Sequence, residues 1–501
     1  MKKRIFSLII SVIMIAVFSA GFETPVYAAS SSWDGKSIDV SWFSPEKEEY
    51  HIATGAQLAG LAAVVNGIYN KDCKVTAGKK SYIVDNRSVN NTSSGPNGNN
   101  LSTADYHYGA YNFAGKTVYL DADIDMSAGN YMPVGGQYLM QKENFDTKIS
   151  SSFCGTLDGQ GHIVNIKCDR HCKARYGDGS SVGLIGRLGV HDNDEVPAGT
   201  PVVRNVIVTG YIYANRSVGG IVGKIGQTGG GGIIENCANY ASVNNTDAKG
   251  IGGIVGAGWN AGEIRSCFNR GRISSTYRCP AGGISGSNEI SIKNCYSTGK
   301  VTAANDYFAM AIGTNNGGMP KVTDCCWLAG SAPGGGYYSS NRGTENGSVA
   351  KTESEMKNAE TAALLGEAFV SDKNGINDGY PILKMMQARK SSPEKTTAGI
   401  MTGAVKVGIS AVKTSGGNKI TVKASTTALK EAGYTVKYRI YRSAKKSSGY
   451  SLVKTSGSKV YKDKKAVKGK KYYYKARVYV YKGSSLMAST AMNRCPAAAV
   501  K

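Results

Sequence analysis

Five copies of one short phrase organise the middle of this 501-residue chain. Each copy is a run of small apolar residues that ends in glycine. The closing residues, spaced 37, 33, 30 and 27 positions apart, are Gly186, Gly223, Gly256, Gly286 and Gly313. A repeat of roughly 20–50 residues predicts a stacked array in which each copy buries its apolar side only against its neighbours. We expect the core repeats of this array over residues 181–327.

A second phrase lies between the copies and ends in Cys237, Cys267, Cys295 or Cys325. A third, shorter segment follows at 240–243, 271–273 and 299–301. The segments are short, β-branched and bounded by glycine, which predicts strands rather than helices. Three short strands per copy favour a coil of a parallel β-helix. A propeller, with four antiparallel strands in each blade, is the alternative.

The repeated phrases resemble the GLUG motif. The resemblance is carried by Gly-Gly-Ile-Val-Gly at 252–256, by Ile-Lys-Asn-Cys at 292–295, and by Gly-Thr-Leu-Asp-Gly-Gln-Gly-His at 155–162. GLUG repeats occur in secreted and surface proteins of Gram-positive bacteria, some of them beside immunoglobulin-A proteases. The resemblance covers roughly residues 33–387 and implies an all-β fold, a right-handed parallel β-helix with small capping helices. It implies a scaffold and leaves activity open, because a fold does not determine a function.

The first 29 residues have the composition of a secretory signal. Lys2, Lys3 and Arg4 precede an apolar run over 5–22, and small residues follow at 28–29. A retained membrane anchor is the alternative. No later run reaches the ~18 apolar residues of a membrane span, so we expect a chain that is secreted, extracellular or loosely associated with the cell surface.

The remainder of the chain divides into caps, a linker and a second domain. Residues 33–67 are expected to cap the array with a helix that begins after Thr54. Residues 352–387 are helical in pattern and are expected to form a C-terminal cap. Residues 388–402, which include Pro393 and show no periodicity, predict a linker. Residues 403–495 resemble a fibronectin type III module, which implies a β-sandwich.

Strand 472–481 of that second domain alternates strictly. The residues expected to face its core are Tyr474, Ala476, Val478 and Val480. Those expected to face outward are Lys475, Arg477, Tyr479 and Tyr481.

Positive charge is concentrated in the last fifth of the chain. Residues 401–501 contain 23 lysines and arginines but only two acidic residues, whereas the whole chain contains 60 and 36. In a secreted protein such a module predicts binding to polyanions, with solubility alone as the alternative. The residues expected to bind are Lys464, Lys465, Lys468, Lys470, Lys471, Lys475 and Arg477.

Two groups of acidic residues are candidates for chemistry. Asp121, Asp123 and Asp125 alternate along the strand expected over 117–126, so they would share one face and could hold calcium. A solvated acidic face is the simpler interpretation. Asp158 and His162 could act as an acid and base pair, although Asp-Gly and Gln-Gly are also turn formers.

The chain contains eleven cysteines. Cys237, Cys267, Cys295 and Cys325 occupy the same phrase in successive copies, so a parallel stack would place them in a ladder about 4.8 Å apart. That spacing permits disulfides. We expect instead an interior ladder of free thiols.

These observations favour a non-catalytic surface or adhesion-type protein. The array would be a rigid binding scaffold, and the basic module would bind a cell-wall polymer, a glycan or a host surface component. We expect a monomer without a cofactor. The alternative is a carbohydrate-active enzyme, a polysaccharide lyase or a glycoside hydrolase, with Asp121, Asp123, Asp158 or Asp192 in a groove. A remnant of protease-type surface machinery is a third possibility.

Overall fold

A computed structural model describes residues 31–66, 74–77, 80–83, 106–108, 111–142, 145–170, 181–189, 199–226, 231–246, 249–258, 262–315, 321–339, 344–389, 391–431, 433–467, 469–492 and 495–500. The predicted signal, residues 1–29, lies outside these ranges. The described residues are mostly strand, as predicted, and several of their sheets are parallel. No helix among them is long and apolar enough to cross a membrane.

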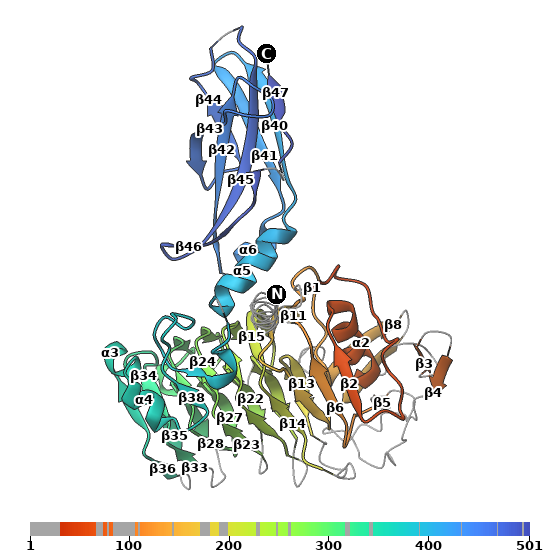
Figure 1. The fold of residues 1–501 in the computed structure, drawn as a ribbon. Helices are drawn as coiled ribbons and strands as arrows, with labels where there is room; N and C mark the ends of the chain where they lie inside the picture. Colours follow the sequence, from red (N-terminus) through yellow and green to blue (C-terminus); the bar gives the residue numbers. More distant parts are fainter. Residues whose placement is uncertain are drawn as a thin grey trace, which may run out of the picture.

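Residues 31–351 form four parallel sheets, to which successive copies each add strands (Figure 1). We call this part the array. The nine-stranded sheet runs β2 (Glu49–Ile52), β6 (Thr117–Leu120), β10 (Thr156–Asp158), β14 (Val202–Arg204), β18 (Ile233–Glu235), β23 (Glu263–Arg265), β28 (Ser291–Lys293), β33 (Lys321–Thr323), β36 (Thr344–Asn346).

The twelve-stranded sheet contains β1 (Ser31–Ser32), β7 (Ile124–Asp125), β11 (Ile163–Arg170), β15 (Ile207–Ala214), β19 (Ala238–Asn239), β20 (Ser242–Asn245), β24 (Phe268–Asn269), β25 (Ile273–Ser275), β29 (Tyr296–Ser297), β30 (Val301–Thr302), β34 (Cys326–Leu328) and β37 (Val349–Lys351). Its long strands β11 and β15 are replaced in later copies by pairs of shorter strands, of which β19 and β20 are the first.

Two smaller sheets complete the array. The five-stranded sheet contains β12 (Ser181–Val182), β16 (Ser217–Gly219), β21 (Gly250–Gly252), β26 (Ala281–Gly282) and β31 (Ala309–Met310). The six-stranded sheet contains β13 (Ile185–Leu188), β17 (Val222–Ile225), β22 (Val255–Gly258), β27 (Ser285–Asn288), β32 (Gly313–Asn315) and β35 (Tyr337–Ser339).

Register is kept along the array. In the nine-stranded sheet the middle residues of the strands are direct partners, and they form a column of buried side chains. The column contains Tyr50, Val118, Leu157, Val203, Ile234, Ile264, Ile292 and Val322. Each side chain therefore packs on the equivalent residue of the next copy, which is how a repeated sequence buries its apolar face.

The glycine-rich phrase spans a corner, and the expectation of three strands per copy is therefore wrong. Residues 217–219 lie in the five-stranded sheet and residues 222–225 lie in the six-stranded sheet. A Cβ on Gly220, between them, would lie 2.2 Å from the carbonyl oxygen of Gly253 and 2.4 Å from Oδ1 of Asn239. Glycine recurs here because neighbouring copies bring their backbones too close for a side chain.

A second corner follows each strand of the nine-stranded sheet. The residue that makes the turn is left-handed in five successive copies, with φ of 51–55°. These residues are Asn205, Asn236, Ser266, Asn294 and Asp324. Asparagine and aspartate tolerate this conformation better than other residues that carry a Cβ, which explains the polar residue before each cysteine.

Helix α2 (Gly55–Asn66) lies at the N-terminal end of the array (Figure 1). As predicted, it begins after Thr54, whose Oγ1 accepts a hydrogen bond from the Gln57 amide at 3.2 Å. The Gln57 side chain in turn accepts from the Thr54 amide at 3.1 Å, which completes a capping box. Nearby strands are β3 (Lys74–Ala77), β4 (Lys80–Ile83), β5 (Tyr106–Tyr108), β8 (Gly136–Lys142) and β9 (Phe145–Ser151).

Residues 352–389 run back along the outer face of the twelve-stranded sheet, and we call them the return segment. Its elements are α3 (Glu353–Met356), α4 (Ala359–Leu364), β38 (Phe369–Val370), β39 (Ile382–Leu383) and η3 (Lys384–Met386). They cover apolar side chains that the sheet turns outward, including stacked Phe268 and Tyr296. Most of the predicted C-terminal cap therefore covers a sheet face, because that face is itself apolar.

The return segment is joined to the sheet by polar contacts as well. Asn377 accepts from the Tyr240 hydroxyl at 2.7 Å and donates to the Tyr296 hydroxyl at 2.7 Å. At its end, Arg389 donates to Asp123 at 2.8 Å, in the loop between β6 and β7. The segment thus connects the last copies of the array to the first.

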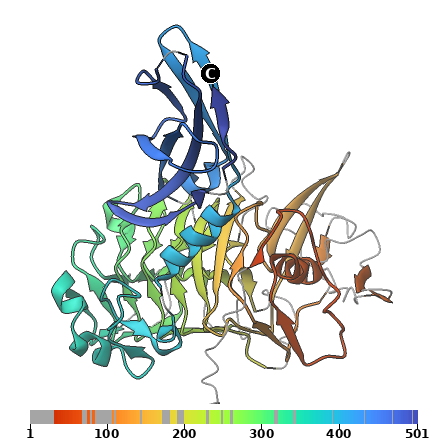
Figure 2. The same ribbon diagram turned by 45° about the horizontal axis from the view of Figure 1, so that its top comes forward.

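The predicted linker is mostly helical. Helix α5 (Pro393–Ala404) starts at Ser392, whose hydroxyl accepts from the Lys395 amide, and Pro393 occupies the first helical turn. A serine followed by proline is an ordinary helix start, and the prediction overlooked it. Thr397 on α5 lies 2.8 Å from Thr209 of the array, while Ala398 is buried in the core of the C-terminal module (Figure 2).

The C-terminal module, residues 407–500, consists of two antiparallel sheets around one core. The first sheet contains β40 (Val407–Thr414), β41 (Gly417–Ala424) and β44 (Val460–Asp463). The second sheet contains β43 (Ser451–Ser456), β42 (Thr435–Ser443), β45 (Tyr472–Lys482), β46 (Ser485–Ser489) and β47 (Ala498–Val500). A short helix, α6 (Thr427–Glu431), precedes β42.

Candidate functional site

The outer face of the second sheet is built by alternation along β42 and β45. Partners on the two strands turn inward together at Val436 and Val480, Tyr438 and Val478, and Ile440 and Ala476, and all six are buried. The pairs between them turn outward: Lys437 with Tyr479, Arg439 with Arg477, and Tyr441 with Lys475. The alternation predicted for 474–481 therefore places a row of cations and tyrosines on one face.

Each cation on this face lies over a tyrosine ring. The distances from cation to ring centroid are 5.1 Å for Lys437 over Tyr481, 4.0 Å for Arg439 over Tyr479, 4.9 Å for Arg477 over Tyr479, 5.2 Å for Lys475 over Tyr450 and 5.4 Å for Lys471 over Tyr473. Arg442, the partner of inward-facing Tyr474, does not belong to this face. Tyr479 points outward as predicted but is only 6% exposed, because two guanidinium groups lie against it. The rings thus hold the cations in place.

The acidic residues of the module do not neutralise this face. Asp463 is buried and accepts from Arg442 at 3.0 Å and from the Tyr474 hydroxyl at 2.8 Å. Within the described residues, no ion pair joins a carboxylate to the four cations Lys437, Arg439, Lys475 and Arg477. The described carboxylates therefore do not offset the positive charge of the face.

The seven residues predicted to bind polyanions fall into two groups. Lys464, Lys465, Lys470 and Lys471 are exposed in the connection between β44 and β45, and Lys468 lies outside the described residues. Lys475 and Arg477 are half-buried on the sheet face. The prediction missed Lys437 and Arg439, because they come from a different strand and only the pairing of β42 with β45 brings them alongside.

The predicted calcium ligands do not form a cluster. A bend between β6 and β7 interrupts the strand expected over 117–126, so the three carboxylates diverge. Asp121 lies 3.0 Å from His51, Asp123 binds Arg389, and buried Asp125 accepts from Asn165 at 2.7 Å. No group of three potential metal-ligating side chains occurs in the part of the chain that the structure describes.

Asp158 and His162 are committed to different partners. Asp158 accepts from Arg204 at 2.8 Å and from Asn205 at 3.0 Å, whereas His162 lies 3.2 Å from Asp123. The two residues predicted as an acid and base pair therefore contact different partners: Asp158 forms an ion pair with Arg204, and His162 lies against Asp123. Asp192 lies outside the described residues.

Asp123 is the most strongly perturbed of these carboxylates. Burial alone would raise its pKa, but hydrogen bonds from His162 and Arg389 outweigh burial and lower the pKa to about 2. The Arg389 side chain is 7% exposed, and it also donates to the Gly161 carbonyl at 3.0 Å. The contacts of Asp123 with Arg389 thus join the return segment to the first copies of the array. Asp123, predicted as a calcium ligand, therefore has a structural role.

The four repeated cysteines lie in one buried column. The Cys237 amide donates to Sγ of Cys267 at 3.4 Å, and the Cys267 amide donates to Sγ of Cys295 at 3.4 Å. Cys325 is buried in the next copy, and all four are free thiols. Burial raises the pKa of the Cys267 and Cys325 thiols well above the usual value, so these thiols are held in the protonated, unreactive form.

A polar column inside the array has no counterpart in the prediction. Asn239 donates to Oδ1 of Asn269 at 2.8 Å, and Asn269 donates to the hydroxyl of Ser297 at 3.3 Å. Each asparagine also binds the backbone two residues further on, at Ala241 or Gly271. The recurrence of Asn or Ser two residues after the repeated cysteine is the signal that would have revealed this column.

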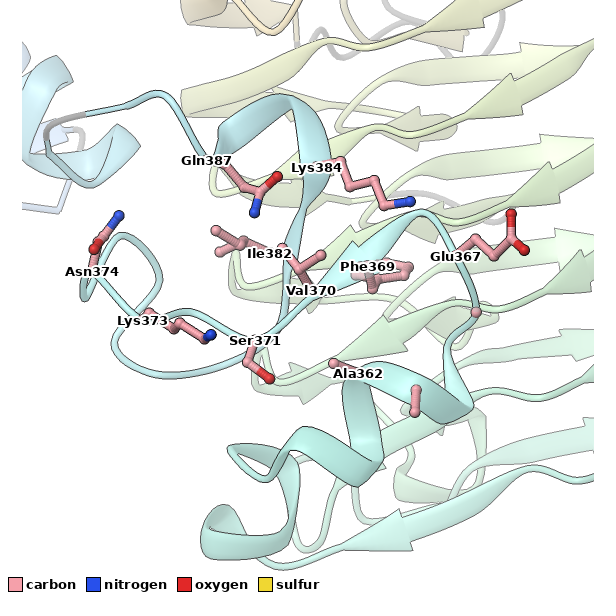
Figure 3. A pocket seen from close by; sticks show the side chains of 12 residues that line it. Ala362, Glu367, Phe369, Val370, Ser371, Lys373, Asn374, Ile382, Lys384 and Gln387 are labelled. Carbon is pink, nitrogen blue, oxygen red and sulfur yellow. The ribbon is translucent and has the colours of Figure 1, made fainter.

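An open groove of about 790 Å³ lies on the return segment (Figure 3). Ile382, Val370 and Phe369 lie side by side in it, with Glu367 beyond Phe369 and Lys373 on the opposite side. The lining contains one carboxylate, Glu367, and so lacks the pair of carboxyl groups that hydrolysis of a glycosidic bond generally needs.

Comparison with known proteins does not identify a family for this chain. No family model matches the chain, and no curated protein matches it. A solved structure from Bacteroides ovatus, described as a "putative immunoglobulin A1 protease", is similar over 72% of this chain and 95% of its own, with 18% identity and a TM-score of 0.39.

Proposed function

We propose that this chain is a secreted, non-catalytic surface or adhesion-type protein that binds an anionic cell-wall polymer or glycan. In this proposal the array is a right-handed parallel β-helix with GLUG-like repeats and serves as a rigid scaffold. The C-terminal module is a fibronectin type III-like sandwich and provides the electrostatic contact.

The fold assignments are supported by strand order and register. Parallel pairing of equivalent strands through successive copies is the arrangement that a β-helix requires. In the C-terminal module, a sheet of β40, β41 and β44 shares its core with a sheet ordered β43, β42, β45 and β46. The second sheet also contains β47, which pairs with β45. Two antiparallel sheets packed around one core are the arrangement of sandwiches of this class.

The observation that carries the binding function is the row of unneutralised cations on β42 and β45. Lys437, Arg439, Lys475 and Arg477 share one sheet face, and no described carboxylate pairs with them. Such a surface attracts a polyanion, and release of counterions makes the binding strongly dependent on salt.

The carbohydrate-active alternative has less support. Hydrolysis of a glycosidic bond generally needs two carboxyl groups facing each other across the substrate. The candidates Asp121, Asp123 and Asp158 instead contact His51, Arg389 and Arg204 respectively.

The test is retention of the mature full-length protein on bacterial cell walls and on heparin-coated beads, with uncharged dextran beads as the control. We expect retention on both anionic supports at ~0.05 M NaCl and release at ~1 M NaCl, because salt at that concentration screens charges beyond about 3 Å. Equal retention on dextran, or retention in the high-salt wash, would contradict an electrostatic role. Release of oligosaccharides from a panel of polysaccharides would favour the enzyme instead.

A further inference from the structure

Two arginines face each other at the centre of the basic sheet face. Arg439 on β42 and Arg477 on β45 are direct cross-strand partners. Both guanidinium groups lie against the same ring, that of Tyr479, at 4.0 and 4.9 Å from its centroid. Two like charges therefore contact the same ring.

The two arginines repel each other, and a bound anion would relieve that repulsion. Like charges directly opposite each other on neighbouring strands destabilise a sheet. Arg477 is held in place, since its Nε donates to the Thr490 carbonyl at 2.5 Å and its Nη2 donates to the Ser489 hydroxyl at 2.7 Å. Nε of Arg439 is buried and has no hydrogen-bond partner among the described residues.

We propose that Arg439 and Arg477 form a clamp for one tetrahedral oxyanion, a phosphodiester or a sulfate ester, within a linear anionic polymer. Lys437 and Lys475, the outward neighbours two residues away on each strand, bind the adjacent charged groups of the same polymer. This inference rests on the proposed function, because it assumes that the module binds an anionic polymer. It adds the kind of anionic group that the module selects.

The geometry favours a tetrahedral group over a carboxylate. A carboxylate presents two coplanar oxygens, which one guanidinium can saturate in a bidentate pair. Sulfate and phosphate oxygens point in several directions, so two guanidiniums on either side can bind the same group.

Stacking of bases or neutral sugars is a poor alternative at this site. Tyr479 is 6% exposed, and Tyr481 and Tyr450 already have a lysine over one face. The rings of the face are therefore used to hold cations, whereas single-strand nucleic acid binding depends on free aromatic faces.

The decisive variant is Arg439→Lys in the mature full-length protein, because it keeps the charge and removes the planar fork. The probes are polyphosphate, which presents tetrahedral phosphate groups in anhydride linkage, heparin, which presents sulfates together with carboxylates, and polygalacturonate, which presents carboxylates alone. We expect Arg439→Lys to weaken binding to polyphosphate and heparin about tenfold and to polygalacturonate less than about twofold. The control Lys464→Gln removes one charge from the exposed β44–β45 connection and should weaken all three by a similar, smaller factor.

The outcomes separate the clamp from the proposed function. If the unmodified protein binds none of the polymers at low salt, the proposed function fails. If it binds but Arg439→Lys weakens all three alike, the function stands and the clamp is wrong. A loss confined to polyphosphate or to heparin supports the clamp and identifies phosphate or sulfate as its ligand. Thermal unfolding of the variant establishes that the module remains folded.

Discussion

The array and the C-terminal module use the same cationic residues in opposite ways. In the array, arginines meet carboxylates, as in the pairs of Arg204 with Asp158 and Arg265 with Glu235. On the outer face of β42 and β45 in the module, arginines and lysines lie over tyrosine rings instead. A cation over a neutral ring keeps its net charge. A cation paired with a carboxylate has most of its electric field cancelled by the opposite charge. The array is thus neutralised internally, and the module presents its charge to the surroundings.

The two regions also differ in how they tolerate change. In the array, equivalent residues of successive copies lie against each other, and this is why a residue type recurs. A substitution there changes contacts with the copies on both sides. The module has one core, and in its connections a Cβ added at glycines such as Gly457 and Gly469 would meet nothing within 4 Å. Substitution of equivalent residue types in the two regions should therefore have very different effects.

The largest effect is expected for Gly220→Ala in the array. The added Cβ would lie 2.2 Å from a backbone carbonyl oxygen of the next copy, so the corner must open. We expect a loss of about 3 kcal/mol or more in the free energy of unfolding, measured by guanidinium denaturation. The matched control is Gly457→Ala in the module, where a Cβ meets nothing within 4 Å and the expected change is within about 0.5 kcal/mol. Equal losses in the free energy of unfolding for the two variants would contradict the expected difference between the array and the module.

An intermediate effect is expected from acid. The pKa of Asp123 is lowered from 3.8 to about 2 in the folded chain, so its ion pair with Arg389 stabilises the folded state above pH ~4. As pH falls from about 4 to 2 the carboxylate is protonated, and about 2 kcal/mol of stability should be lost.

Asp123→Asn isolates this contribution from that of other acids. The variant should be less stable than the unmodified protein near neutral pH, and the difference in urea denaturation should shrink between pH 4 and pH 2. Glu353→Gln is the control, since its carboxylate is exposed and its pKa is lowered by Lys357 on the surface, and it should change the acid profile less than Asp123→Asn does. A difference for Asp123→Asn that does not vary with pH would show that the ion pair does not stabilise the fold.

The smallest effect is expected at the left-handed corner. Ser266 has a φ of 51° where equivalent copies have asparagine or aspartate. Ser266→Asn should raise the free energy of unfolding by about 0.5 kcal/mol, because asparagine adopts this conformation at lower cost. The reciprocal change, Asn236→Ser at the equivalent corner, should lower it by a similar amount. Changes of the same sign in the free energy of unfolding of both variants would contradict this explanation of why a polar residue occupies the left-handed corner.

The repeated features were predictable because they depend on contacts between equivalent residues. The glycine phrases and the cysteines were expected to stack, and the structure places Cys237, Cys267 and Cys295 in contact from one copy to the next. The split of the glycine phrase into two strands was not predicted, because its small apolar residues are buried on both sides of the corner and show no alternation.

The features that were missed depend on pairings between distant parts of the chain. Nothing around Asp123 indicates Arg389, which is 266 residues away. Likewise, the basic face arises only when β42 and β45 pair. One available signal went unused: outward positions of the twelve-stranded sheet, such as Phe268 and Tyr296, are as apolar as inward ones, and a face of that kind needs a cover.

The return segment also limits the length of the array. It starts beside the last strands and ends at Asp123, near the first, so its span has to match the number of copies between them. One more copy would add about 4.8 Å to the distance that it bridges. Repeat arrays often gain or lose units by duplication, but here each such change would separate Arg389 from its carboxylate. We therefore expect the number of copies and the length of the return segment to change only together.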